Sequence, residues 1–173
     1  MWYSAPRRYY MKIVKVEDPE MLASLSHEKY VLHGSDKPIE VVEPRQAKTR
    51  QKVPINNQLA VYASLCIAVP IIHAVIRHVD ESSQMSWEIK KDERIHVWGR
   101  GVRFVTGYVH LLPKESFEIH EGGLFCLSRK PVKTIRAYRV EPQILHKLDD
   151  VILSPHLTSV LDATITVLKR RTV

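Results

Sequence analysis

Two short polar stretches of the chain carry side chains that could bind a substrate, and each follows an apolar run. The first, His33-Gly34-Ser35, ends the segment YVLHGS, and the second, the Tyr-Ala-Ser at 62–64, ends LAVYAS. A histidine at a strand end can hydrogen-bond a sugar hydroxyl. A tyrosine ring can stack on a planar ring, with a gain of about 1 kcal/mol beyond the burial of area. Glycine beside the histidine leaves its N–H and C=O open to a ligand because it has no Cβ. These residue types predict a nucleotide pocket.

The better-known catalytic and metal-binding patterns are missing from the sequence. It holds no GxGxxG, GxxxxGK[ST], HExxH or GxSxG segment. His73 and His78 are five residues apart and would not share a helical face. Cys66 and Cys126 lack CxxC spacing, which indicates reduced thiols and a cytoplasmic setting. We therefore expect a cytoplasmic protein without a metal centre.

In their order and their strand context, the two stretches resemble the motifs of the ADP-ribosyltransferase superfamily. Its poly(ADP-ribose) polymerase-like and rifampin-transferase-like branches have one strand ending in His-Gly-Ser/Thr and a later strand with a Tyr-Ala-Thr/Ser type of motif. The resemblance covers residues 29–79 well and the later part of the chain only by arrangement. It implies an α+β fold with a split β-sheet and an NAD-type cleft. It also implies transfer of ADP-ribose from NAD to a protein or nucleic-acid acceptor, with release of nicotinamide.

The resemblance assigns a role to each matching residue. His33 would hold the ribose, Gly34 the carboxamide, and Tyr62 would stack on the nicotinamide. Arg45 lies in the basic segment before the tyrosine and is a candidate for the diphosphate, because a guanidinium fork matches phosphate oxygens. The residues implied to bind NAD are therefore His33, Gly34, Ser35, Arg45, Tyr62 and Ser64, the last as a support for the pocket.

Transferases of this superfamily also place a glutamate at the start of a late strand, where its carboxylate stabilises positive charge developing on the sugar. At the corresponding place in this sequence stand Leu124 and Phe125, which carry no charge. The nearest carboxylate is Glu121, followed by two glycines that would let the backbone turn it towards the ribose. We take Glu121 as the catalytic candidate, with Glu118 and Glu115 as further possibilities.

Other interpretations of the same residues stay open. His33-Gly34 could simply end a strand, and Tyr62 could be a core aromatic. The chain could be a degenerate member of the superfamily that binds NAD or ADP-ribose without turnover. It could also be a basic nucleic-acid-binding protein without NAD chemistry, because the net charge is +7 and the pI is about 9.5. Its densest basic segments are 45–52, 129–136 and 169–171.

The pattern of apolar residues predicts the elements that must position these groups. A length of 173 residues indicates one domain over 11–173 after a flexible extension at 1–10. No apolar run approaches the roughly 20 residues of a membrane span, so we expect no membrane partner. We expect strands at 12–16, 29–33, 59–63, 102–113, 123–128 and 133–140, a hairpin over 86–99, and a loop at 44–58. Helices are expected from Asp18 to about 25, over 65–79 with Ser64 as its cap, from 141, and over 157–171.

The basic loop leads to a first testable prediction. If the basic surface binds a nucleic acid, the affinity of the protein for it should fall on the order of tenfold or more between 50 and 200 mM salt, because binding releases counterions from the phosphates. Neutralising Lys48, Arg50 and Lys52 together should weaken binding of a short DNA duplex, measured by fluorescence anisotropy. Unchanged binding in the triple variant would assign these residues to a solvated loop.

Overall fold

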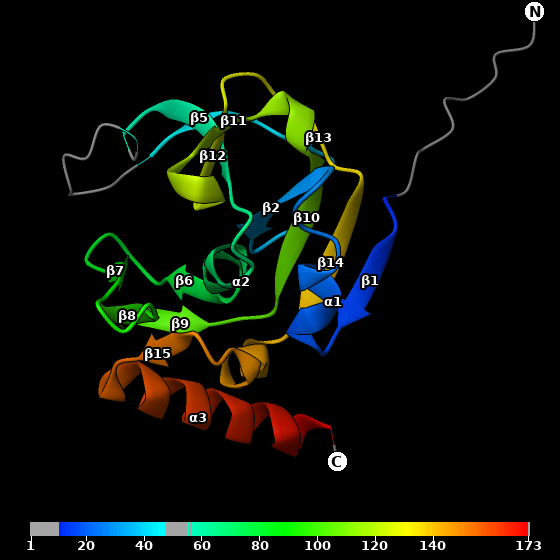
Figure 1. The fold of residues 1–173 in the computed structure, drawn as a ribbon. Helices are drawn as coiled ribbons and strands as arrows, with labels where there is room; N and C mark the ends of the chain where they lie inside the picture. The colour runs from blue at the N-terminus through cyan, green and yellow to red at the C-terminus, as the bar shows by residue number, and fades with distance from the viewer. Residues whose placement is uncertain (1–10, 48–54, 56, 173) are drawn as a thin grey trace, which may run out of the picture.

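The computed structural model describes residues 11–47, 55 and 57–172, and it is an α+β protein. The expected α+β class is confirmed. Helix α2 lies near the centre of Figure 1, with one four-stranded sheet above it and the other towards its right, and a three-stranded sheet with helix α3 lies at the lower end. The expected extension at 1–10 lies outside the described residues, as do Lys48, Arg50 and Lys52.

The first sheet contains the strand that ends in His-Gly-Ser. Its strands, in spatial order, are β1 (Ile13–Val16), β14 (Arg136–Val140), β10 (Gly107–Pro113) and β2 (Tyr30–Ser35). Strand β2 was expected to break at Gly34, but it runs on to Ser35, because β10 pairs with it as far as Tyr108 opposite Ser35. After β1, helix α1 (Pro19–Ala23) begins as expected, with Asp18 as its cap.

The second sheet contains the strand with the Tyr-Ala-Ser motif. Its strands, in spatial order, are β11 (Glu118–His120), β12 (Phe125–Ser128), β5 (Leu59–Ala63) and β4 (Arg45–Gln46). The expected strand at 59–63 is confirmed. Residues 45 and 46 were expected in a loop, but they form β4, because β5 supplies a partner strand for them. A separate pair joins β3 (Val41–Val42) to β13 (Val132–Lys133).

Helix α2 (Ala68–Val75) is buried on every side except at His73 and packs against β2 and β10. It is shorter than the helix expected over 65–79. It begins after Ile67 without a side-chain cap, because the Ser64 hydroxyl accepts the N–H of Cys66 instead. Pro70 lies in the first turn, where its missing N–H costs no helical hydrogen bond. Residues 76–78 leave the helix to form β6 (Ile76–His78), which pairs with β9 (Val102–Phe104).

The end of the molecule below α2 in Figure 1 is built from the expected hairpin and the C-terminal helix. Strands β7 (Gln84–Ile89) and β8 (Ile95–Arg100) form the hairpin, and β15 (Val151–Leu153) pairs parallel with β8. The helix expected from 141 is a 3-10 turn, η4 (Pro142–Lys147). Two further 3-10 turns are η2 (Lys114–Ser116) and η3 (Glu121–Gly123).

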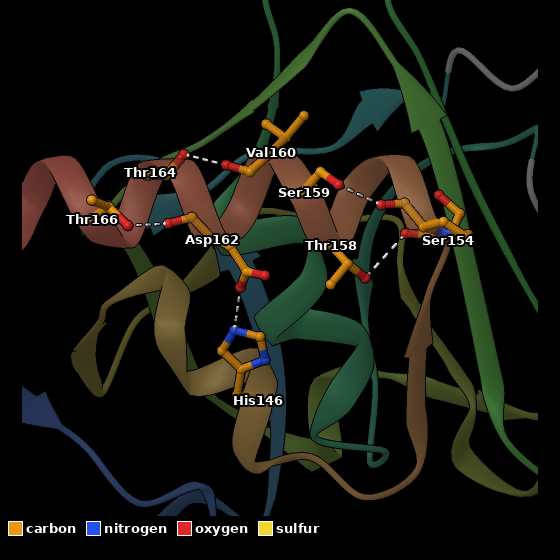
Figure 2. Close-up of polar contacts among 9 residues, drawn as sticks. His146, Ser154, Thr158, Ser159, Val160, Asp162, Thr164 and Thr166 are labelled. Atoms are coloured by element: carbon orange, nitrogen blue, oxygen red, sulfur yellow. Dashed lines mark hydrogen bonds and ion pairs between the residues drawn. The ribbon is translucent and has the colours of Figure 1, made fainter.

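Helix α3 (Pro155–Arg171) confirms the helix expected at the C-terminal end, with three cations in its last turn. Ser154 caps it, and Leu157 and Leu161 anchor it in the core. Its threonine and serine hydroxyls donate to carbonyls one turn back, and His146 of η4 contacts Asp162 at 3.2 Å (Figure 2). The carbonyls of the helix therefore accept the hydrogen bonds of its own Ser and Thr hydroxyls, while Leu157 and Leu161 cover the core.

Glycine at position 34 is required by the packing of α2. A Cβ built on Gly34 would collide with the carbonyl oxygen of Pro70 and would lie 2.9 Å from the backbone nitrogen of Ala74. Both obstacles are backbone atoms of a buried helix, so they cannot move aside as a flexible side chain would. The close contact of β2 with α2 therefore depends on this glycine.

We predict that Gly34→Ala lowers the free energy of unfolding by about 2 kcal/mol or more, because the added methyl group forces α2 away from β2. Gly122→Ala is the comparison. Its Cβ would have nothing within 4 Å, so it bears only the cost of a positive φ of 65°, about 1 kcal/mol. Urea unfolding of both variants measures the difference, and equal losses would contradict the packing argument.

Candidate functional site

A cavity of about 1600 Å³ is lined by β2 and β5 where the two strands separate. Helix α2, strand β7 and turn η3 supply its other walls. The residues implied to bind NAD and the first catalytic candidate all border this one cavity: His33, Gly34, Ser35, Arg45, Tyr62, Ser64 and Glu121. The fold therefore brings together residues that are up to 88 positions apart in sequence, from His33 to Glu121.

The backbone ladder between β2 and β5 stops after one pair. Leu32 and Ser64 exchange both of their hydrogen bonds, at 3.0 and 2.8 Å. In an antiparallel ladder the next such pair would be Gly34 with Tyr62, because hydrogen-bonded pairs recur every two residues. That pair is not part of the ladder. The same alternation directs the N–H and C=O of Gly34 away from β10 and into the gap, where no described residue hydrogen-bonds them.

The imidazole of His33 occupies the place of the missing pair. Its Nδ1 lies 2.6 Å from the carbonyl oxygen of Tyr62. A carbonyl can only accept, so Nδ1 carries the proton and Nε2 is left as an acceptor. Burial lowers the pKa of His33 below its ordinary value of 6.5, with a smaller contribution from Arg45. At neutral pH the neutral ring therefore offers an acceptor nitrogen, which suits a hydroxyl group of a ligand.

A second histidine, His110 of β10, holds the backbone around His33. Its Nε2 accepts the N–H of Ile39 at 2.9 Å, so its Nδ1 carries the proton and donates to the His33 carbonyl at 3.3 Å. The two rings lie 5.9 Å apart. Burial and the neighbouring His33 lower the pKa of His110 to about 4, which keeps it neutral. This buried histidine had no role in the sequence analysis, although its place in the apolar strand GYVHLLP is a signal of burial.

Tyr62 and Arg45 lie on the same face of the second sheet. Arg45 is directly opposite Ala60 in the ladder, and Ala60 and Tyr62 share a face because they are two residues apart. The Tyr62 hydroxyl accepts the N–H of Gln58 at 2.9 Å and shares its proton between the carbonyls of Ile55 and Gln58. The tyrosine ring is thereby fixed at its polar end and remains half-buried beside the cavity.

Ser64 fixes the turn that carries Glu121. Its hydroxyl donates to the carbonyl of Gly123 at 3.3 Å, and the next N–H along the chain, that of Leu65, donates to the same carbonyl at 2.8 Å. Glu121, Gly122 and Gly123 all have positive φ values, of 48°, 65° and 97°. A positive φ is uncommon for glutamate and costs of order 1 kcal/mol or more. The strained turn directs an exposed carboxylate-bearing residue to the cavity.

The other carboxylate candidates lie elsewhere. Glu118 is on β11, where it contacts His120 and Arg129, and Glu115 is on η2. Neither lines the cavity. Ser35 does line it, but its hydroxyl is held by the backbone of Lys37 in a local turn, at 2.5 and 3.0 Å.

Apolar and aromatic groups form the wall next to Glu121. Leu124 and Phe125 both border the cavity, and the Phe125 ring stacks on Trp87 of β7, with centroids 5.9 Å apart and planes at 24°. The Trp87 Nε1–H donates to Nε2 of His73 at 3.2 Å. The His73 side chain is exposed towards the cavity. Desolvation by the surrounding protein, with smaller contributions from His33 and His78, nevertheless lowers its pKa to about 4. Sequence reasoning missed Trp87, because 14 positions separate it from His73 and no local pattern joins them.

Cys66 and Cys126 are free, and burial raises the pKa of Cys126 to about 11, so its thiol stays protonated at neutral pH. The described part of the chain has no group of three or more His, Cys, Asp or Glu side chains that could hold a metal ion. Over the same residues, no helix has both the length and the apolar character needed to cross a membrane.

Comparison with known proteins identifies no relative. No family model matches the chain, and no curated protein or solved structure matches it. The chain is an α+β protein with a cavity where strands of two sheets separate.

The hydrogen bonds around the cavity predict histidine tautomers. His33, His73 and His110 should each carry a single proton on Nδ1 at pH 7, because Nδ1 of His33 donates to a carbonyl and Nε2 of the other two accepts an N–H. Long-range ¹H–¹⁵N correlation spectra measure this directly, with the exposed His156 as a reference for a solvated imidazole. A proton on Nε2 of His33 would contradict the acceptor role.

Proposed function

We propose that this protein binds NAD in the cavity and transfers its ADP-ribose to an acceptor, releasing nicotinamide. The observation that carries the proposal is the interrupted ladder, in which Gly34 offers an N–H and a C=O that no described residue hydrogen-bonds, beside the acceptor nitrogen of His33. A carboxamide has one donor and one acceptor group that match the two backbone groups of Gly34. The proposal includes the finer fold assignment, an ADP-ribosyltransferase-like split sheet.

The surrounding residues fit the remaining parts of NAD. The Nε2 atom of His33 would accept a hydrogen bond from a ribose hydroxyl. The half-buried ring of Tyr62 would stack on the nicotinamide. Arg45 has no carboxylate within ion-pair distance among the described residues, so its guanidinium would be available to the diphosphate.

Transfer requires that the bond between C1′ of the ribose and the nicotinamide nitrogen breaks. Its electron pair goes to the ring, which leaves as neutral nicotinamide, and the acceptor heteroatom forms the new bond to C1′. The acceptor loses one proton to a carboxylate or to water. Glu121 would stabilise the positive charge that develops on the ribose, as the carboxylates of glycosidases do.

The aromatic wall around Phe125 supports a second candidate, a protein that binds NAD without turnover. Leu124 and Phe125 occupy the strand start where a transferase of this kind would have its glutamate, and both border the cavity. In that case Glu121, one turn earlier, would not reach the ribose. Release of nicotinamide distinguishes the two functions.

We predict that Glu121→Gln retains NAD binding, because the amide fills the same space, but loses transfer by a factor on the order of a hundred or more. His33→Ala should weaken NAD binding as well as turnover. Calorimetry measures the binding, and chromatography measures the nicotinamide released.

Glu118→Gln and Glu115→Gln are matched controls, since both carboxylates lie outside the cavity. Full activity in Glu121→Gln would remove Glu121 from the mechanism. NAD binding without any release of nicotinamide by the unaltered protein would favour the second candidate. The absence of NAD binding at millimolar concentration would overturn both.

A further inference from the structure

Strand β7 has one open side. It is the last strand in its sheet, whose order is β15-β8-β7, and no described strand pairs with its outer edge. The strand is six residues long and contains neither proline nor lysine, two of the usual devices that prevent an edge from pairing, and its one charged residue is Glu88. An edge of this kind carries a row of unpaired N–H and C=O groups that a further strand could use.

The register identifies which groups are unpaired. The hairpin closes with the Lys90 N–H donating to the Arg94 carbonyl at 3.1 Å. Hydrogen-bonded pairs therefore recur at Glu88, Ser86 and Gln84. The N–H and C=O groups of the intervening residues, Met85, Trp87 and Ile89, point away from β8.

The other side of β8 agrees with this register. The Ile95 N–H donates to Asp150 at 2.7 Å, and the Val97 carbonyl accepts from Ser154 at 2.8 Å, both on the side of β15. Ile95 and Val97 are the ladder neighbours of Ile89 and Trp87, so neither of them can satisfy the outer groups of β7.

The open side of β7 borders the candidate site. All six residues of the strand, from Gln84 to Ile89, line the cavity. A strand that presented only one face would contribute every second residue, because successive side chains point to opposite faces. On the inner strand β8 only Trp98, Gly99 and Arg100 line the cavity, so it is the outer strand β7 that borders it along its whole length.

We infer that the edge of β7 binds the acceptor as an extended segment of a protein, which adds a strand to the β15-β8-β7 sheet. The inference rests on the proposed function and names its acceptor class. Backbone hydrogen bonds to Met85, Trp87 and Ile89 hold the segment in register, as in other cases of β-strand addition. Every second side chain of the segment then lies on the Trp87 side of the sheet, towards Phe125 and the Glu121 turn.

The charges around the cavity favour a peptide over a nucleic acid. Basic and acidic side chains border it together, and Arg77 is paired with Asp36. A nucleic acid needs an excess of positive charge along its backbone, and it has no row of alternating donors and acceptors to match a strand edge. A peptide backbone has that pattern and carries no charge.

Two proline variants test the edge without removing a ladder bond. Met85→Pro and Ile89→Pro each delete an N–H that points outward, a position where proline is tolerated. Ile13→Pro is the matched control. Ile13 is on the edge strand β1, outside the cavity, and its N–H also points outward, because its neighbour Lys12 bonds to β14. Thermal unfolding verifies that each variant is folded, and two edge variants keep the test valid if one of them is not.

The probe is a mixture of acetylated and amidated decapeptides of random sequence, at millimolar total concentration with NAD. Mass spectrometry measures the peptide that carries ADP-ribose. We expect labelling by the unaltered protein and by Ile13→Pro, and at least a tenfold loss in both edge variants. The same mixture with N-methylated backbones should not be labelled. Equal labelling by the edge variants, or labelling of a random 15-base single-stranded DNA in place of the peptides, would overturn the inference.

Hydrogen exchange separates this inference from the proposed function. The decapeptide mixture should slow exchange of the Met85, Trp87 and Ile89 amides even without NAD. Protection without any labelling would mean that the edge binds peptide while the proposed transfer reaction fails. Labelling without protection, or neither, would overturn the binding of peptide at β7.

Discussion

The cavity exists because the ladder between β2 and β5 ends after Leu32 and Ser64. If the strands continued to pair, the next hydrogen bonds would join Gly34 to Tyr62 and would close the space between the two four-stranded sheets. His33 prevents this by donating its Nδ1–H to the Tyr62 carbonyl, so that the carbonyl is satisfied without the strand. The backbone groups of Gly34 are left facing the gap. The His33 side chain therefore links the two sheets by a hydrogen bond in place of a backbone pair, and the gap beside it stays open.

The rest of the fold supports that arrangement from behind. Helix α2 packs so closely on β2 that Gly34 has no room for a Cβ, and His110 ties the His33 carbonyl to the backbone of Ile39. Both contacts fix the direction in which β2 leaves the ladder. Glycine is required at this position because a Cβ would point at the Pro70 carbonyl of the helix.

The opposite wall of the cavity combines a strained turn with an aromatic pair. Ser64, which belongs to the last ladder pair, also holds the Gly123 carbonyl, so the position of Glu121 depends on the same junction as His33 does. Trp87 of the hairpin stacks on Phe125 of this wall and donates a hydrogen bond to His73 of helix α2. The open edge of β7 begins there, which is why a segment bound to the edge would pass in front of the Glu121 turn.

The sequence alone determined the α+β class, most of the strands, the C-terminal helix and the residues that would line a common cavity. These follow from local alternation, from proline and glycine, and from two short motifs, all of which are written in neighbouring residues. It did not determine the end of β2, the length of α2 or the strand at 45–46, because pairing with distant strands overrides local preference there. Only the tertiary structure decided that Gly34 serves helix packing, that His33 takes the place of a ladder pair, that Glu121 rather than Glu118 or Glu115 borders the cavity, and that Trp87 joins its wall. Each of these depends on contacts between residues far apart in the chain, whose spacing no sequence pattern records.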